Sequence, residues 1–260
     1  MQKERAFRAL SLLLFFGSIF EVLTVLIRKL PLFVTIPALW ALLAICTAAI
    51  GKRYGKATAV GADIVYAAFT LLSMHFAYAS SIALSIAFLS FPFVWDAELQ
   101  HKSLKKIFNY LGLKTEGFLM NALLGVAATI FIIGPLVIAE AIVVVMLLHL
   151  EEPGKVSMIV SGLPLYILIF SFTIGPIAEE IFFRGFLLSR VGIILSSLLF
   201  ALAHYSYGSY TEFLAAFTAG FVFAVLYKKS KSIIPSIFAH ATFNFINVIM
   251  VVSYGLQVVK

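Results

Sequence analysis

Long apolar runs separated by short polar segments dominate the chain. A helix needs about 20 predominantly apolar residues to cross a bilayer. The run from Ala57 to Trp95 contains one charged residue, Asp63, and is too long for one straight helix, so we expect a hairpin that turns near Ser80 and Ser81. The other runs are Ala9 to Ile27, Leu30 to Ile50, Phe118 to His149, Ile159 to Arg190, Gly192 to Tyr207, Glu212 to Tyr227 and Ile233 to Val252. The pattern predicts an all-α fold, a polytopic transmembrane helical bundle with about eight spans.

Composition supports this prediction and excludes other classes of protein. Of the 260 residues 62% are hydrophobic and 12% are charged, whereas soluble domains carry roughly 25% charged residues. These values exclude a soluble globule, a disordered chain and a nucleic-acid-binding module. We therefore expect residues 1–260 to form a single integral membrane domain embedded in a lipid bilayer.

The placement of the cations predicts an orientation. Lysine and arginine collect in cytoplasmic loops of membrane proteins, which accounts for the net charge of +7. The cationic segments are Gly51–Lys56, Lys102–Lys114 and Lys228–Lys231, whereas the loop with Glu151 and the tract with Ser209 carry no excess of cations. The sequence thus places the first three segments in the cytoplasm and the last two on the other side.

Two local signals refine the elements. Leu104, Ile107, Phe108 and Leu111 repeat at i, i+3, i+4 and i+7 with lysines between them, which predicts a short amphipathic helix on an anionic leaflet. Ser209 begins a Ser-x-x-Glu capping box, which marks the start of the penultimate span.

Ionisable groups inside a membrane are costly, so they indicate candidate functional residues. Glu21, His75 and Glu140 each stand alone on their runs, and a hydrogen bond between packed helices is the favoured interpretation. Six further residues concentrate in the last third of the chain: Glu179, Glu180, Arg184, His204, His240 and Asn244.

Simple helix geometry brings these six residues together. If the chain turns between Arg190 and Gly192, Glu180 and His204 both lie about 15 to 18 Å from the turn, at 1.5 Å per residue. His240 lies about 10 Å into the last span, with Asn244 one turn deeper on the same face. We also expect Gly175 and Pro176 to break the preceding helix, which membrane proteins tolerate where the break lines a cavity.

The same six residues could perform acid–base chemistry. Two adjacent carboxylates in a low dielectric are not both easily ionised, so Arg184 would hold one as an anion and the other becomes a candidate general base. His204 could share the activation of water, and His240 with Asn244 could donate to an oxyanion. A polar network that only holds helices together is the alternative.

Three motifs resemble those of a known family. Glu179-Glu180-Ile-Phe-Phe-Arg184 reads EExxxR, Phe200-Ala-Leu-Ala-His204 reads FxxxH, and His240-Ala-Thr-Phe-Asn244 reads HxxxN. In this order they resemble the CAAX prenyl protease 2 and bacteriocin-processing (CPBP, Abi) family of intramembrane glutamate proteases. The motif-bearing core would cover residues 159–253.

The resemblance implies a metal-independent endopeptidase without a cofactor, whose site opens toward the cytoplasm. By similarity, Glu179 and His204 activate water, His240 and Asn244 stabilise the oxyanion, and Glu180 and Arg184 support the first motif. Arg184 follows Glu180 by four residues, the better spacing for an ion pair, which agrees with Glu179 as the base. The implied partner is a protein or peptide substrate, prenylated or not.

Three other functions remain open at this point. A zinc protease could use Glu179, His204 and His240 as ligands, although the chain has no HExxH helix. A non-catalytic membrane scaffold or bacteriocin-immunity-type protein could keep the fold with an idle site. A transporter fits less well, because no intramembrane carboxylate series repeats in two halves.

The orientation can be tested by labelling single cysteines in a Cys46→Ala background with an impermeant maleimide. We expect cysteines at Lys52, Lys105 and Lys229 to react from the cytoplasmic face and one at Ser209 to react from the opposite face. Labelling of the Lys105 and Ser209 replacements from the same face would contradict the predicted topology.

Overall fold

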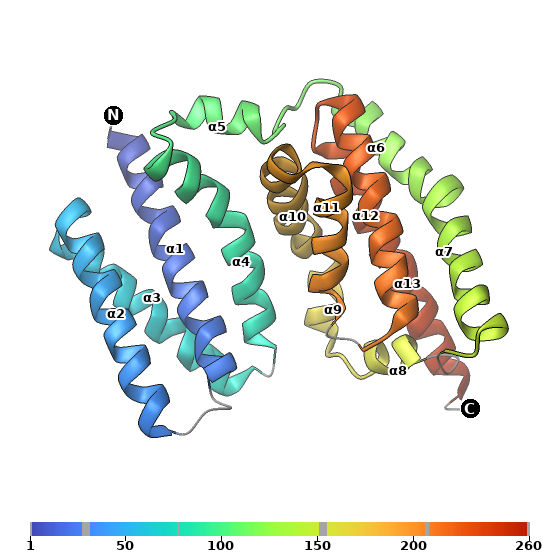
Figure 1. The fold of residues 1–260 in the computed structure, drawn as a ribbon, viewed down its shortest axis with the longest axis horizontal. Helices are drawn as coiled ribbons and strands as arrows, with labels where there is room; N and C mark the ends of the chain where they lie inside the picture. Colours follow the sequence, from blue (N-terminus) through green and yellow to red (C-terminus); the bar gives the residue numbers. More distant parts are fainter. Residues whose placement is uncertain (1, 28–31, 77, 151–154, 206–207, 259–260) are drawn as a thin grey trace. The chain divides into compact units, whose positions relative to one another are not determined.

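The computed structural model describes residues 2–27, 32–76, 78–150, 155–205 and 208–258, and none of these residues forms a strand. Six helices in the described ranges are long and apolar enough to cross a membrane. The all-α membrane bundle is therefore confirmed, with the count of about eight spans only approximate. Figure 1 labels the α-helices. The elements are α1 (Gln2–Ile27), α2 (Leu32–Tyr54), α3 (Lys56–His75), α4 (Ala79–Val94), η1 (Trp95–Leu99), α5 (Leu104–Tyr110), α6 (Phe118–Ala128), η2 (Thr129–Ile133), α7 (Gly134–Ala141), η3 (Ile142–Leu147), α8 (Lys155–Ser161), α9 (Leu165–Phe172), α10 (Ile174–Glu180), η4 (Ile181–Leu187), α11 (Leu188–Ala203), α12 (Tyr210–Ser230) and α13 (Ile234–Val258), where η marks π-helical turns.

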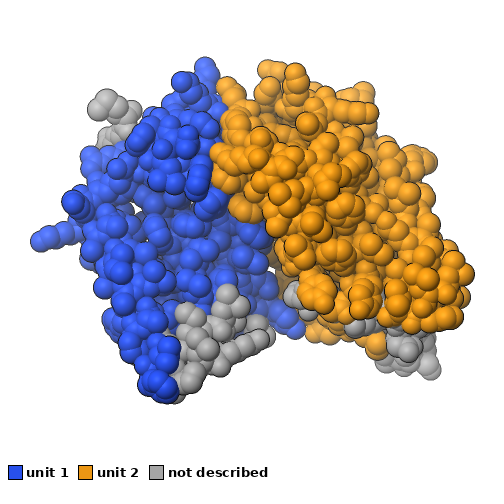
Figure 2. All heavy atoms as spheres, in the orientation of Figure 1, with its two compact units in different colours: residues 1–107 blue, residues 108–260 orange. Residues whose placement is uncertain are grey.

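The chain forms two compact units, Met1–Ile107 and Phe108–Lys260, which Figure 2 shows in blue and orange. All six candidate site residues belong to the second unit. The single membrane domain expected for residues 1–260 stays a prediction.

In the first unit, α1 packs against both α3 and α4, and α2 packs against α3. The predicted hairpin is present as α3 and α4, with the helix interrupted between His75 and Ala79 rather than at Ser80 and Ser81. Glu21 is fully buried on α1, and the Thr70 hydroxyl on α3 donates to it at 3.4 Å. Glu21 thus makes the interhelical hydrogen bond expected of it, whereas His75 is exposed at the end of α3.

In the second unit, α6 packs closely against α13, the helix that carries His240. The contact centres on Gly125, where a Cβ atom would lie 2.3 Å from the carbonyl oxygen of Pro235 and 2.8 Å from the nitrogen of Ala239. One turn further, the Thr129 hydroxyl donates to the Ala239 carbonyl at 2.8 Å. Only a residue without a side chain permits this approach of the two backbones.

The helices that carry the first two motifs are interrupted at two positions, one of them at the predicted place and the other two residues before Gly175. The helix breaks at Thr173, between α9 and α10, so Gly175 and Pro176 lie in the first turn of α10. A second break lies within α11 at Gly192, whose φ of +83° is not helical. Glycine adopts such a backbone without steric cost, so the predicted turn between Arg190 and Gly192 is confirmed.

The two local sequence signals are also present. Helix α5 covers Leu104–Tyr110, with Ile107 fully buried and Lys105 and Lys106 exposed. Ser209 precedes α12, and its hydroxyl accepts the Glu212 backbone N–H at 3.0 Å, as an N-cap should. The acidic loop at Glu151 and Glu152 lies outside the described residues.

The contact between α6 and α13 predicts the effect of a Gly125→Ala substitution. The added methyl group would clash with backbone atoms of α13, and the clash is relieved only if the two helices move apart. The unfolding free energy should therefore fall by about 1–3 kcal/mol. Thermal unfolding in one detergent measures the change. Gly162→Ala is the control, because a Cβ added at Gly162 would lie 3.6 Å from the nearest atom, which is an ordinary contact distance. Equal stability of the two variants would contradict the packing described here.

Candidate active site

The centre of the candidate site is a buried ion pair between Glu180 and Arg184. Arg184 Nη1 lies 3.1 Å from Glu180 Oε1, and the two side chains are 1% and 0% exposed. Glu180 ends α10, and Arg184 lies in the π-helical turn η4 that follows directly, so the two face each other across one turn. Such turns inside α-helices are frequent at functional sites.

The Arg184 guanidinium is held by groups from two other helices. Its Nη2 donates to the Gly220 carbonyl of α12 at 3.1 Å. The central carbon of the guanidinium, Arg184 Cζ, lies 4.3 Å from the ring centre of Phe200 in α11 and 5.2 Å from that of Phe223 in α12. A Cβ at Gly220 would lie 3.0 Å from Arg184 Nη2, so glycine leaves the space that the guanidinium occupies. Cation–π contacts of this kind strengthen when they are shielded from water.

The ion pair also orients His240. Nδ1 of His240 lies 2.9 Å from Glu180 Oε1, and the ring stacks on Phe223 at a centroid distance of 5.1 Å. A carboxylate beside Nδ1 indicates that this nitrogen carries a proton, an assignment that rests on the hydrogen-bond partner. The other ring nitrogen, Nε2, consequently points to Glu179, 4.0 Å from its Oε2.

Glu179 and His204 face each other at the more open side of the site. Glu179 Oε2 lies 3.9 Å from His204 Nε2, and the two side chains are 23% and 21% exposed. A continuous helix would separate residues 179 and 204 by about 37 Å, so their proximity depends on the reversal at Gly192. His204 Nδ1 lies 2.9 Å from the Phe200 carbonyl, which fixes the ring with Nε2 toward the glutamate.

The Glu179 oxygen that faces the two histidines is itself unsatisfied. Oε2 is buried and has no hydrogen-bond partner among the described residues. Its separations of 3.9 and 4.0 Å from the two nitrogens exceed a direct hydrogen bond but suit a bridging water molecule.

Asn244 lies one turn beyond His240 on α13, and its polar contact is with a different element. Nδ2 donates to the Ser171 carbonyl at 2.7 Å. Ser171 lies in the last turn of α9, where helix carbonyls lack an intrahelical partner. One N–H of the Asn244 carboxamide therefore satisfies a backbone carbonyl at the end of α9. The second N–H of the same group is left for another acceptor.

The structure brings Glu179, Glu180, Arg184, His204 and His240 into one cluster, as the sequence predicts. Within the described ranges, no group of three or more His, Cys, Asp or Glu residues is arranged to hold a metal ion. Sequence reasoning missed Gly220 and Phe223, which lie three residues apart on α12 and shape the surroundings of Arg184 and His240. Neither carries a polar side chain, and no pattern within one helix indicates what a neighbouring helix will place against it.

Comparisons with known proteins cover this part of the chain. Residues 161–246 match the family described as type II CAAX prenyl endopeptidase Rce1-like. The protein named "Putative membrane peptidase YdiL" from Bacillus subtilis (strain 168) is 37% identical over 109 residues, which cover 38% of this chain and 43% of that protein. The chain thus spans less than half the length of this curated relative, and no solved structure matches it. Residues 161–246 thus match the family that the three motifs resemble, which supports the resemblance over this part of the chain.

Proposed function

We propose that the protein is an intramembrane endopeptidase in which Glu179 and His204 activate a water molecule. One observation carries this proposal: the unsatisfied Glu179 Oε2 faces His204 Nε2 at 3.9 Å and His240 Nε2 at 4.0 Å. The match of residues 161–246 to a protease family supports a peptide bond as the target.

The first step is proton transfer from water to Glu179. A water molecule bridging Glu179 and His204 loses a proton to the carboxylate, and its oxygen attacks the carbonyl carbon of the peptide. Glu180 is a poorer base, because Arg184 and His240 already engage its Oε1. The proton held by Glu179 then passes to the leaving amine as the carbon–nitrogen bond breaks.

His240 and Asn244 stabilise the oxyanion of the tetrahedral intermediate. His240 Nδ1 donates to Glu180, so donation from Nε2 to the oxyanion requires a proton on each ring nitrogen. Asn244 contributes the N–H that Ser171 leaves free. Donors placed in advance around a developing charge supply a large share of catalysis in water-poor sites.

The substrate we propose is a protein or peptide cleaved near the membrane surface, with a CAAX-type prenylated chain as the first candidate. The cationic segments near Lys105 and Lys229 support an opening of the site toward the cytoplasm. The match of residues 161–246 supports the class of substrate, and the distribution of charge supports the side on which it is cleaved.

Two alternative functions are a zinc protease and a non-catalytic membrane protein. A zinc protease would use Glu179, His204 and His240 as ligands. Among the described residues no group of three or more such side chains is arranged to hold a metal ion, and chelation tests this alternative directly. A non-catalytic scaffold or immunity factor would keep the Glu180–Arg184 pair for stability while lacking hydrolysis.

We expect substitutions of Glu179 and Glu180 to differ in their effects on hydrolysis and on stability. Glu179→Gln should lower peptide hydrolysis by at least about 100-fold and leave unfolding unchanged, because the amide preserves shape and loses basicity. Glu180→Gln should lower the unfolding free energy by about 3–5 kcal/mol, because Arg184 then stays buried without its anion. Cleavage of isoprenylated and unmodified fluorogenic peptides is measured beside thermal unfolding in one detergent.

Full activity of the Glu179→Gln variant would refute the assigned base. An inactive Glu180→Gln variant of normal stability would indicate that the roles are exchanged. Activity that chelation removes and added zinc restores would favour the zinc protease, and no cleavage of any peptide by the parent protein would favour the scaffold.

A further inference from the structure

A buried hydroxyl group links the last two helices one turn away from His240. Ser236 lies in the first turn of α13 and is fully buried, and its hydroxyl donates to the Phe223 carbonyl of α12 at 2.8 Å. Buried serines inside helices usually bond a carbonyl of their own helix, as Ser90 and Ser197 do here. Ser236 instead joins two helices that both contribute to the candidate site.

Phe223 contacts α13 with its backbone and with its ring. Its carbonyl accepts from Ser236, and its ring stacks on that of His240 with a centroid distance of 5.1 Å and an interplanar angle of 23°. Ser236 and His240 are four residues apart, so they lie on the same face of α13. The Phe223 ring also lies 5.2 Å from Arg184 Cζ, which places it against the ion pair that orients His240. Any shift of Phe223 would therefore change the surroundings of the imidazole.

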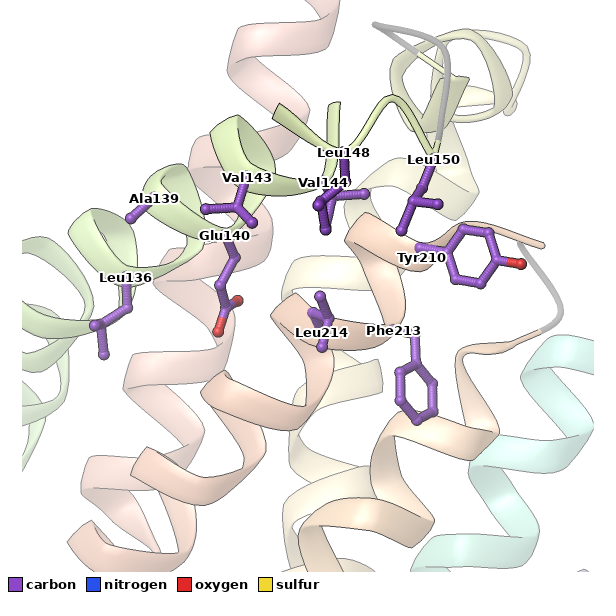
Figure 3. Close-up of a pocket in the computed structure, with 10 residues that line it drawn as sticks. All are labelled: Leu136, Ala139, Glu140, Val143, Val144, Leu148, Leu150, Tyr210, Phe213 and Leu214. Atoms are coloured by element: carbon purple, nitrogen blue, oxygen red, sulfur yellow. The ribbon is translucent and has the colours of Figure 1, made fainter. Parts of the chain in front are cut away.

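A second hydrogen bond from a hydroxyl holds α12 to α7. The Thr218 hydroxyl donates to Glu140 Oε1, which is the hydrogen bond between packed helices expected from the sequence. Figure 3 shows the Glu140 side chain, which extends from α7 toward α12. This bond resembles that of Ser236 in its chemistry, but it joins α12 to a helix that carries none of the motif residues. It therefore provides a matched comparison.

We propose that Ser236 is a positioning residue for His240 and that it acts through Phe223. The bond from its hydroxyl fixes where α13 passes α12, so that the Phe223 ring covers the His240 ring. An imidazole held against an aromatic face is restricted in its rotation about χ2, so Nδ1 stays 2.9 Å from Glu180 Oε1. The importance of this restraint for catalysis rests on the proposed function, whereas the restraint itself does not.

The positioning can be measured by NMR without peptide hydrolysis. The full chain, with isotope-labelled histidine and in detergent micelles, gives ring signals from five histidines, and His240→Gln identifies the signal of His240. A buried Nδ1 proton that is bonded to a carboxylate exchanges with solvent only when the bond opens. We expect Ser236→Ala to speed this exchange about tenfold, because the ring leaves Glu180 more often once Phe223 can shift.

Two further variants separate positioning from a general loss of packing. Thr218→Val is the matched control, because it also removes a hydroxyl from an interhelical bond of α12, and it should leave the exchange at His240 Nδ1 unchanged. Phe223→Leu should speed the exchange by itself. In that background Ser236→Ala should add less than about twofold, because a residue that acts through the Phe223 ring has little further effect once the ring is removed. Thermal unfolding in the same detergent shows that each variant is folded.

Unchanged exchange in Ser236→Ala would overturn the proposal. Equal acceleration in Thr218→Val would overturn it as well, because His240 would then respond to any loosening of α12. Fully additive effects of Ser236→Ala and Phe223→Leu would show that Ser236 does not act through the ring.

Hydrolysis gives a second measurement that depends on the proposed function. Ser236→Ala should lower kcat about tenfold and leave KM unchanged, because the restraint concerns the group that stabilises the oxyanion and not substrate binding. An unchanged kcat beside faster exchange would overturn the catalytic importance of the restraint. A parent protein that cleaves no peptide would contradict the protease, and the exchange measurement would still decide whether Ser236 positions His240.

Discussion

The buried charge of Arg184 is the constraint on which the site depends. A guanidinium at 1% exposure in a membrane protein requires an anion and further polar partners, because water does not reach it. Glu180 supplies the anion and the Gly220 carbonyl supplies an acceptor. The rings of Phe200 and Phe223 add cation–π contacts, with their centres 4.3 and 5.2 Å from Arg184 Cζ. One side chain thereby fixes the relative positions of η4, α11 and α12, and its partner Glu180 extends the same constraint to His240 on α13.

Adjacent carboxylates acquire different properties from this arrangement. Glu180 points into the protein, where two positively charged or proton-donating groups share one of its oxygens. Glu179, one residue earlier, is rotated by about 100° and faces the two histidine Nε2 atoms without a direct partner for Oε2. The two acids therefore differ in environment rather than in chemistry, and this difference is the reason why we propose Glu179 rather than Glu180 as the base.

The sequence predicts the parts of this arrangement that are local. The spacing of four residues between Glu180 and Arg184, the reversal at Gly192 and the break before Glu179 all follow from helix geometry and from residues that end helices. The contact of Asn244 with Ser171 was not predictable, because it depends on where α9 ends beside α13. The same holds for Gly125 and Gly220, since a glycine inside an apolar helix gives no sign of which backbone or side chain approaches it.

The support for His240 extends beyond the segment that resembles the protease family. Residues 161–246 contain all six polar residues of the three motifs. The helix that carries two of them, α13, packs on α6 and on the turn η2 that follows it. Gly125 of α6 and Thr129 of η2 approach Pro235 and Ala239, and both precede that segment by more than 30 residues. The Nε2 atom of His240 can keep its distance from Glu179 only if α13 is held in place. Because productive catalytic geometry tolerates displacements of only about 0.5 Å, the contact with α6 contributes to the position of His240 even though α6 bears none of the motifs.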